Sequence, residues 1–174
     1  MKVNIFVAII ILYMINFIST LICIYCVKMN NFKTKTLYYI GTCLMLLMSL
    51  FLGLINTVYK GDESLTDQLS LSQTPLYVFG FAISLGPFIW QLITEAFPFE
   101  NRIRFASICV FIQWSCNAAL SLSVDKIIDY LHGNVGNLYF IFFGMIILCI
   151  IFINRYIPET TGKSIEDAVR MYMR

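Results

Sequence analysis

The sequence predicts an all-α, polytopic membrane protein with five transmembrane helices. Of its 174 residues 59% are hydrophobic and 13% are charged, about half of the roughly 25% charged residues that soluble domains carry. The mean hydropathy is +0.79, and the charged residues gather in short segments that leave five long uncharged gaps. A soluble domain is excluded because so few polar side chains could not cover its surface. The expected surrounding of most of the chain is therefore a lipid bilayer.

Each uncharged gap is long enough to cross a membrane. A helix of about 20 apolar residues spans a hydrocarbon core of roughly 30 Å, and backbone groups in lipid must pair within the chain. The third gap starts with polar residues, so we expect that helix to begin near Pro75, since proline suits a first helical turn. The predicted helices cover about 3–27, 36–59, 74–96, 105–124 and 135–156, which gives a membrane domain over 1–157 and a tail over 158–174.

Basic residues divide unequally between the two sides of these helices. Nine Lys and Arg residues fall on the side of the 28–35 segment, the 97–104 segment and the tail, and three fall on the other side, at 2, 60 and 126. Because basic residues favour the cytoplasmic side, we expect the N-terminus outside and the C-terminus in the cytoplasm. The plasma membrane is the expected location. The net charge of +2 and the lack of a long Lys/Arg run predict no nucleic-acid partner.

The sequence contains no complete motif for enzyme catalysis or metal binding. All six cysteines lie in predicted helices, and His132 is the only histidine, so no zinc framework is expected. The Gly162-Lys163-Ser164 run resembles the end of a P-loop, but the upstream glycine is missing. We see no nucleophile–base–acid set and expect no enzyme, no metal and no cofactor.

Polar residues inside the third and fourth helices point to a ligand site. Pro87 follows Gly86 near mid-span, removes a backbone N–H and frees the carbonyl of Ile83. A broken helix is tolerated in a membrane where it lines a cavity, as at the binding sites of transporters. An indole and neutral amides suit a polyhydroxyl ligand such as a sugar, and these are supplied by Trp90, Gln91, Gln113 and Asn117. The alternative is helix–helix packing, which we prefer for the second helix with Thr42, Ser49 and Gly53.

Three motifs in order resemble the C-terminal part of a sugar porter, the hexose-transporter branch of the major facilitator superfamily. The tenth helix of that family carries Gly-Pro-x-x-Trp followed by Glu, Phe-Pro and a basic residue, and here these read Gly86, Pro87, Trp90, Glu95, Phe97-Pro98 and Arg102. Gln113-Trp114-x-x-Asn117 resembles the Asn-Trp-x-x-Asn of helix eleven, and Pro158-Glu159-Thr160 opens a segment similar to Pro-Glu-Thr-Lys-Gly. The segment around Asn16 looks like helix eight. The five predicted helices would then be helices eight to twelve.

This resemblance implies roles for particular residues. Positions that contact sugar in the family are occupied by Asn16, Trp90, Gln113 and Trp114, with Asn117 a weaker candidate. Glu95, Arg102 and Glu159 match a cytoplasmic charge network of the family; the alternative is that they are solvated ends of helices. The sequence departs from the family at Ala82, where an acidic sugar contact is usual, and at Gln113, where the family has Asn.

The resemblance implies facilitated transport of a hexose or a similar small polyol by a partial or truncated member. Twelve spans of about 20 residues need roughly 240 residues, more than the 174 here, so an N-terminal half or a full-length porter is an expected partner. No charge lies deep in a span, which favours a facilitator over a symporter. The alternative is a non-transporting truncated paralogue that acts as a partner or regulator of a full-length porter. Ser164 and Asp167 resemble a capping pair that opens a short tail helix.

Overall fold

The computed structural model describes residues 5–28, 33–58 and 63–172, and the regular structure in these ranges is helical. The helices are α1 (Ile5–Lys28), α2 (Thr34–Val58), α3 (Glu63–Ile83), α4 (Leu85–Ala96), α5 (Arg102–Tyr130), α6 (Val135–Tyr156) and α7 (Ile165–Tyr172). Five stretches of the described residues are long and apolar enough to cross a membrane. The prediction of an all-α chain with five membrane-spanning helices is therefore confirmed.

Helix ends differ from the predicted ones where charged or polar residues extend a helix into water. α5 begins at Arg102 and ends at Tyr130, about one turn before the predicted start at 105 and nearly two turns beyond the predicted end at 124. α6 covers the predicted 135–156. The predicted ends at residues 3 and 59, the basic residues at 2 and 60, and the last two residues of the tail lie outside the described residues.

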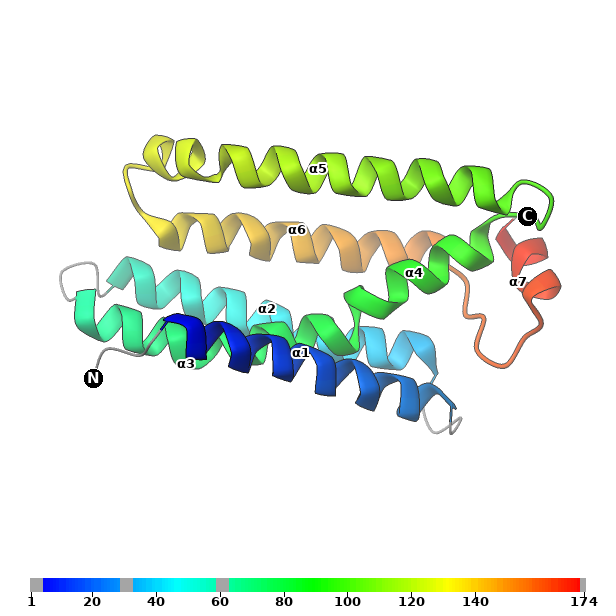
Figure 1. Ribbon diagram of the computed structural model, residues 1–174, viewed down its shortest axis with the longest axis horizontal. Helices are drawn as coiled ribbons and strands as arrows, with labels where there is room; N and C mark the ends of the chain where they lie inside the picture. The colour runs from blue at the N-terminus through cyan, green and yellow to red at the C-terminus, as the bar shows by residue number, and fades with distance from the viewer. Residues whose placement is uncertain (1–4, 29–32, 59–62, 173–174) are drawn as a thin grey trace.

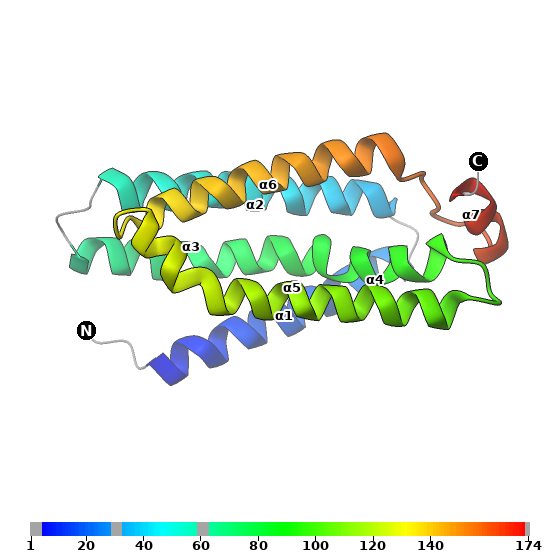
Figure 2. The ribbon, with the colours of Figure 1, turned by 90° about the horizontal axis from the view of Figure 1, so that it is seen from above.

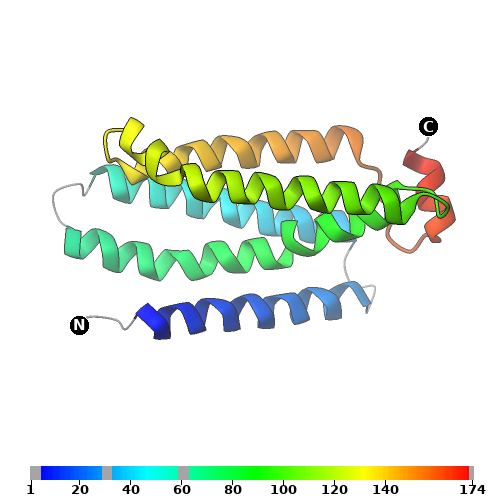
Figure 3. The same cartoon turned by 45° about the horizontal axis from the view of Figure 1, so that its top comes forward.

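The third span consists of two helices, because α3 ends at Ile83 and α4 begins at Leu85. The stretch that is apolar enough to cross a membrane runs over Ser72–Ala96, close to the predicted 74–96, but the helix itself begins earlier than predicted, at Glu63, and carries Pro75 in its interior. A proline inside a helix removes one backbone hydrogen bond, and the polar residues before it can continue the helix outside the hydrocarbon. Figures 1 and 3 show α4 leaving the axis of α3 and rising toward the start of α5.

α2 is the central packing element and contacts both α3 and α6, as the view from above shows (Figure 2). Its small residues allow this close packing, because a Cβ on Gly41 would lie 2.5 Å from the carbonyl oxygen of Gly80 and from Cβ of Ser84. Thr42 and Ser49 are both 0% exposed. The polar face of the second span therefore serves helix packing, as the sequence predicted.

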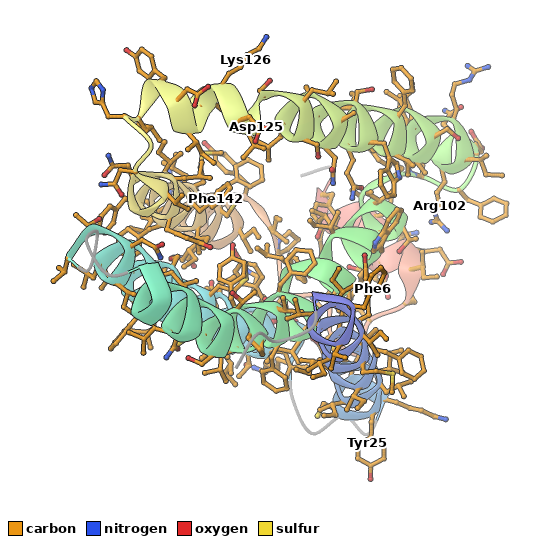
Figure 4. All side chains as sticks on the ribbon, turned by 60° about the vertical axis from the view of Figure 1, so that its left-hand side comes forward. Phe6, Tyr25, Arg102, Asp125, Lys126 and Phe142 are labelled. Atoms are coloured by element: carbon orange, nitrogen blue, oxygen red, sulfur yellow. The ribbon has the colours of Figure 1, made fainter. Side chains whose placement is uncertain are left out.

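α1 and α5 are the least covered helices. α1 packs on α3, and its Tyr25 projects away from the other helices (Figure 4). α5 runs alongside α6 (Figure 1), but none of its side chains is fully buried. At the end near α7, an apolar cluster of Tyr38, Phe88, Ile153 and Ile157 joins α2, α4 and α6. This cluster fixes α4 at an angle to α3.

Candidate functional site

The break between α3 and α4 is built by Ser84, Gly86 and Pro87. Pro87 has no N–H to offer the carbonyl of Ile83, and the thiol of Cys23 on α1 donates to that oxygen at 3.5 Å instead. Ser84 is 2% exposed, and its hydroxyl donates to the carbonyl of Gly80 at 2.6 Å. A neighbouring helix and a buried hydroxyl therefore satisfy polar groups at the break, which makes the kink compatible with a membrane.

Gly86 allows the chain to pass close to α3. A Cβ at this position would lie 3.3 Å from the carbonyl oxygen of Phe81 and 3.4 Å from its ring. A larger residue at 86 would push α4 away from Phe81 and change the angle of the break.

A groove of about 370 Å³ lies beside this break, between α1, α3, α4 and α5. We call it the midspan groove. Its lining is Asn16, Thr20, Phe81, Ala82, Gly86, Pro87, Ile89, Trp90, Gln113 and Trp114. Six of the eight predicted substrate-binding residues thus lie around one groove, although they come from three helices that are far apart in the sequence.

The midspan groove is uncharged and aromatic. Trp90 and Trp114 are 47% and 61% exposed, so both indole rings remain available to a ligand. The side-chain oxygen Oε1 of Gln113 is buried and has no hydrogen-bond partner among the described residues. A buried polar atom without a partner costs free energy, so Gln113 offers an unpaired acceptor beside the groove.

The other two predicted residues lie elsewhere. Gln91 faces away from the midspan groove, and its Nε2 donates to Oε1 of Glu95 at 2.7 Å. Asn117 lies one turn beyond Gln113 on α5 and is exposed. Asn117 does not line the midspan groove because of the direction in which α5 runs. The spacing of the Gln-Trp-x-x-Asn motif did not indicate this.

Four lining residues were absent from the predicted set. Thr20 had a signal in the sequence, because it shares a polar helix face with Asn16, one turn away. Its hydroxyl donates to the Asn16 carbonyl at 2.9 Å. Ala82 was noted only as a departure from the family. Phe81 and Ile89 are apolar residues in an apolar helix, and their place in the lining depends on the break at Ser84.

A threonine–glutamate cluster joins α2, α4 and the tail at the end of the bundle near α7. Glu95 accepts a hydrogen bond from Thr160 at 2.6 Å in addition to the one from Gln91. The Thr161 hydroxyl donates to the carboxylate of Glu159 and accepts the backbone N–H of Thr34 at 2.8 Å. The threonine–glutamate cluster is defined here as Thr34, Gln91, Glu95, Glu159, Thr160 and Thr161.

Arg102, the third predicted member of the charge network, is not part of this cluster. Its Nε donates to the carbonyl of Phe97 at 3.2 Å, and its guanidinium lies 5.7 Å from the centre of the Phe99 ring. Figure 4 shows it near the start of α5. Arg102 therefore stabilises the turn between α4 and α5.

The tail closes the cluster from outside. Backbone N–H of Asp167 donates to the Ser164 hydroxyl at 3.2 Å, and that hydroxyl donates to the Asp167 carboxylate at 2.8 Å, so the predicted capping pair opens α7. Burial, together with the negative charges of Glu95 and Glu159, raises the pKa of Tyr172 to about 12. The tyrosine hydroxyl, which is neutral at physiological pH in any case, therefore stays neutral further into the alkaline range.

The chain matches the family model described as "Sugar (and other) transporter" over residues 1–172. It is 30% identical over 163 residues to the hexose transporter HXT14 of Saccharomyces cerevisiae, covering 94% of this chain and 29% of that protein. It is 31% identical over 162 residues to the facilitated trehalose transporter Tret1 of Bombyx mori, covering 91% of this chain and 31% of that protein. The chain thus spans about a third of the length of these curated relatives.

Solved structures of similar fold include the inward-open xylose transporter XylE from E. coli, with a TM-score of 0.76 and 29% identity over 94% of this chain and 35% of the other. A crystal structure of a D-xylose-proton symporter gives a TM-score of 0.70 and 28% identity, covering 91% of this chain and 35% of that one. At these identities and scores the helical arrangement is shared over most of the present chain.

Proposed function

Because the chain belongs to the sugar transporter family of the major facilitator superfamily, we propose that it takes part in moving a sugar across a membrane through the midspan groove. One observation carries the proposal: Trp90, Trp114 and the unpaired oxygen of Gln113 line the same groove at a helix break. Indole faces pack on the apolar faces of a sugar ring, and amide groups exchange hydrogen bonds with its hydroxyls.

The proposed substrate is a hexose or a similarly sized neutral polyol. The residues lining the midspan groove are all uncharged, and an ionic ligand would need an opposite charge in so apolar a setting. Ala82 is 2% exposed and carries no group that titrates, which supports facilitated movement over proton coupling by this part of the protein.

In this mechanism the groove binds and orients the sugar while the two parts of the broken helix move apart or together. Ser84 provides the flexible point, because its backbone departs from helical geometry, and Gly86, two residues on, has no side chain to restrict the bend. The threonine–glutamate cluster anchors the far end of α4 to α2 and the tail. Motion of α4 about Ser84 then changes access to the groove, as alternating access requires.

The same proposal includes an orientation and a location. With nine basic residues on one side and three on the other, the N-terminus lies outside and residues 158–174 lie in the cytoplasm. The plasma membrane is the proposed location, where a sugar carrier would supply the cell.

Tryptophan fluorescence tests sugar binding directly, because both tryptophans of the chain lie in the midspan groove. We expect D-glucose to change the fluorescence of the purified chain in detergent with saturation, and L-glucose, the matched control, to have no such effect. Trp90→Phe and Trp114→Phe assign the signal to one ring or the other. Equal responses to the two enantiomers would refute a sugar site.

Uptake of labelled glucose by cells that lack hexose transporters tests transport. The chain is expressed alone and together with a full-length porter, and surface delivery is measured in both. Uptake above background supports transport by the groove.

The second candidate function is a partner or regulator of a longer porter. It is favoured by one observation, namely that α5 lines the groove without burying any side chain and so leaves its surface open to another membrane helix. Altered uptake by the co-expressed porter, without uptake by the chain alone, would support this second function.

A further inference from the structure

A second groove, of about 480 Å³, lies on the other side of α4, between α1, α2 and α4. Among the described residues, Pro87 alone lines both grooves. The second groove follows from the helix break: α1 is tied to α3 by the bond from Cys23 to Ile83, and beyond that point α4 turns away from α1 (Figure 3). We call the resulting space the interfacial groove.

The interfacial groove has a polar end and an apolar end. Lys28, the last residue of α1, and Thr34, the first of α2, line it where the two helices reach the membrane surface. Cys23 lies five residues before Lys28, about 7.5 Å deeper at 1.5 Å per residue. At that depth the thiol of Cys23 and the hydroxyl of Ser84 already donate to backbone carbonyls. The deep end therefore presents mainly carbon to an occupant.

The polar end is basic. Lys28, Lys33 and Lys35 fall within eight residues, and none of the described residues that line the groove is acidic. Glu95, on the neighbouring turn of α4, is held by Gln91 and Thr160 within the threonine–glutamate cluster. The hydroxyl of Tyr38, which also lines the groove, is buried without a partner among the described residues. The rest of the deep wall is mostly apolar, so most hydroxyls of a sugar would be buried there without partners.

We propose that the interfacial groove binds one anionic phospholipid, with its phosphate at Lys28 and one acyl chain along the apolar walls of α1 and α4. A lysine near the membrane surface contributes about 1 kcal/mol to the attraction of an anionic lipid, which corresponds to about a fivefold preference. The chain would cover Ile24, which is 55% exposed and lines the groove. This site does not depend on the proposed sugar transport.

Native mass spectrometry of the purified chain tests the site with two probes, phosphatidylglycerol and phosphatidylcholine that carry the same acyl chains. We expect about fivefold more phosphatidylglycerol to be retained. Lys28→Ala should abolish this preference, whereas Arg155→Ala, which removes an exposed basic residue from the last turn of α6, should keep it. Lys28→Gln repeats the test with a longer polar side chain if circular dichroism shows that the alanine variant is unfolded.

A second pair of variants tests the acyl-chain part. Ile24→Trp fills the groove and should reduce retention of both lipids, whereas Ile22→Trp places the same side chain on an exposed position outside the groove and should not. Equal retention of the two lipids by the wild-type chain would overturn the proposal. So would equal effects of the paired variants, which would indicate bulk lipid, or displacement of the lipid by glycerol 3-phosphate alone, which would indicate a site for a soluble anion.

Discussion

Replacing Gln113 by leucine should stabilise the folded chain while it weakens sugar binding. The Oε1 atom of Gln113 is buried without a partner among the described residues, and leaving a buried acceptor unpaired costs about 1–3 kcal/mol. Because the side chain as a whole is only half-buried, we take the lower end, about 1 kcal/mol. For a chain of this size the corresponding rise in melting temperature is about 2–4 °C.

The same substitution removes the hydrogen bond that a sugar hydroxyl would donate to Gln113. A neutral hydrogen bond contributes about 0.5–1.5 kcal/mol, so the dissociation constant should rise about two- to tenfold. Thermal unfolding followed by circular dichroism measures the first effect, and tryptophan fluorescence with D-glucose measures the second.

Gln91→Leu is the matched control, because Gln91 is the other predicted glutamine and lies outside the midspan groove. Its Nε2 donates to Glu95 at 2.7 Å, so the same change there should lower stability by about 1 kcal/mol and leave sugar affinity unaltered. A lower melting temperature for Gln113→Leu, or an unchanged dissociation constant, would show that Gln113 is a packing residue and that the reasoning is wrong.

Three further predictions concern packing and the tail. Gly41→Ala should destabilise the chain by about 1–3 kcal/mol through overpacking, because the added Cβ would lie 2.5 Å from the carbonyl oxygen of Gly80. The control variant Gly144→Ala should stabilise the chain by about 0.5–1 kcal/mol, because its Cβ would have no neighbouring atom within 4 Å. Equal melting temperatures for the two variants would contradict the α2–α3 contact. Glu95→Gln loses a charged acceptor for Gln91 and Thr160 and should make the tail more susceptible to limited proteolysis; a proteolysis rate like that of the wild type would argue against the threonine–glutamate cluster. The pKa of Tyr172 is raised from 10.0 to about 12, so the contribution of its neutral hydroxyl to stability is fully present below pH 10 and is lost as the pH rises toward 12. The melting temperature of the Tyr172→Phe variant should lack this pH dependence. Thermal unfolding of both proteins at a series of pH values measures the difference.

The membrane spans could be predicted because they depend on composition alone. In lipid, the backbone N–H and C=O groups of an uncharged stretch of at least 20 residues must form hydrogen bonds within the chain, which favours a helix. α6 begins and ends at the predicted residues 135 and 156. The break was also predictable, since Gly86 and Pro87 act on their own backbone. The start of α3 was not, because continuation of a helix through Pro75 depends on the solvent around it.

Residue type predicted most of the midspan groove, but helix direction decided its final members. Gln91 and Trp90 are adjacent in the sequence and equally suited to a sugar, yet they lie on different faces of α4 and line different grooves. The hydrogen bonds of Thr161 to Thr34 and Glu159 join residues up to 127 positions apart. Such contacts follow from tertiary structure, and no local pattern in the sequence indicates them.

Because α5 is exposed, residues that determine ligand specificity on this helix can change independently of the residues that stabilise the fold. Since none of its side chains is fully buried against the rest of the chain, changes at the groove residues Gln113 and Trp114 carry little folding penalty, whereas changes at Thr42 or Ser49 on α2 disturb close packing. Lineages can therefore diverge along α5 by neutral drift and acquire new ligand preferences without first gaining compensatory stability. Natural variants that alter recognition without reducing protein abundance should concentrate on this helix.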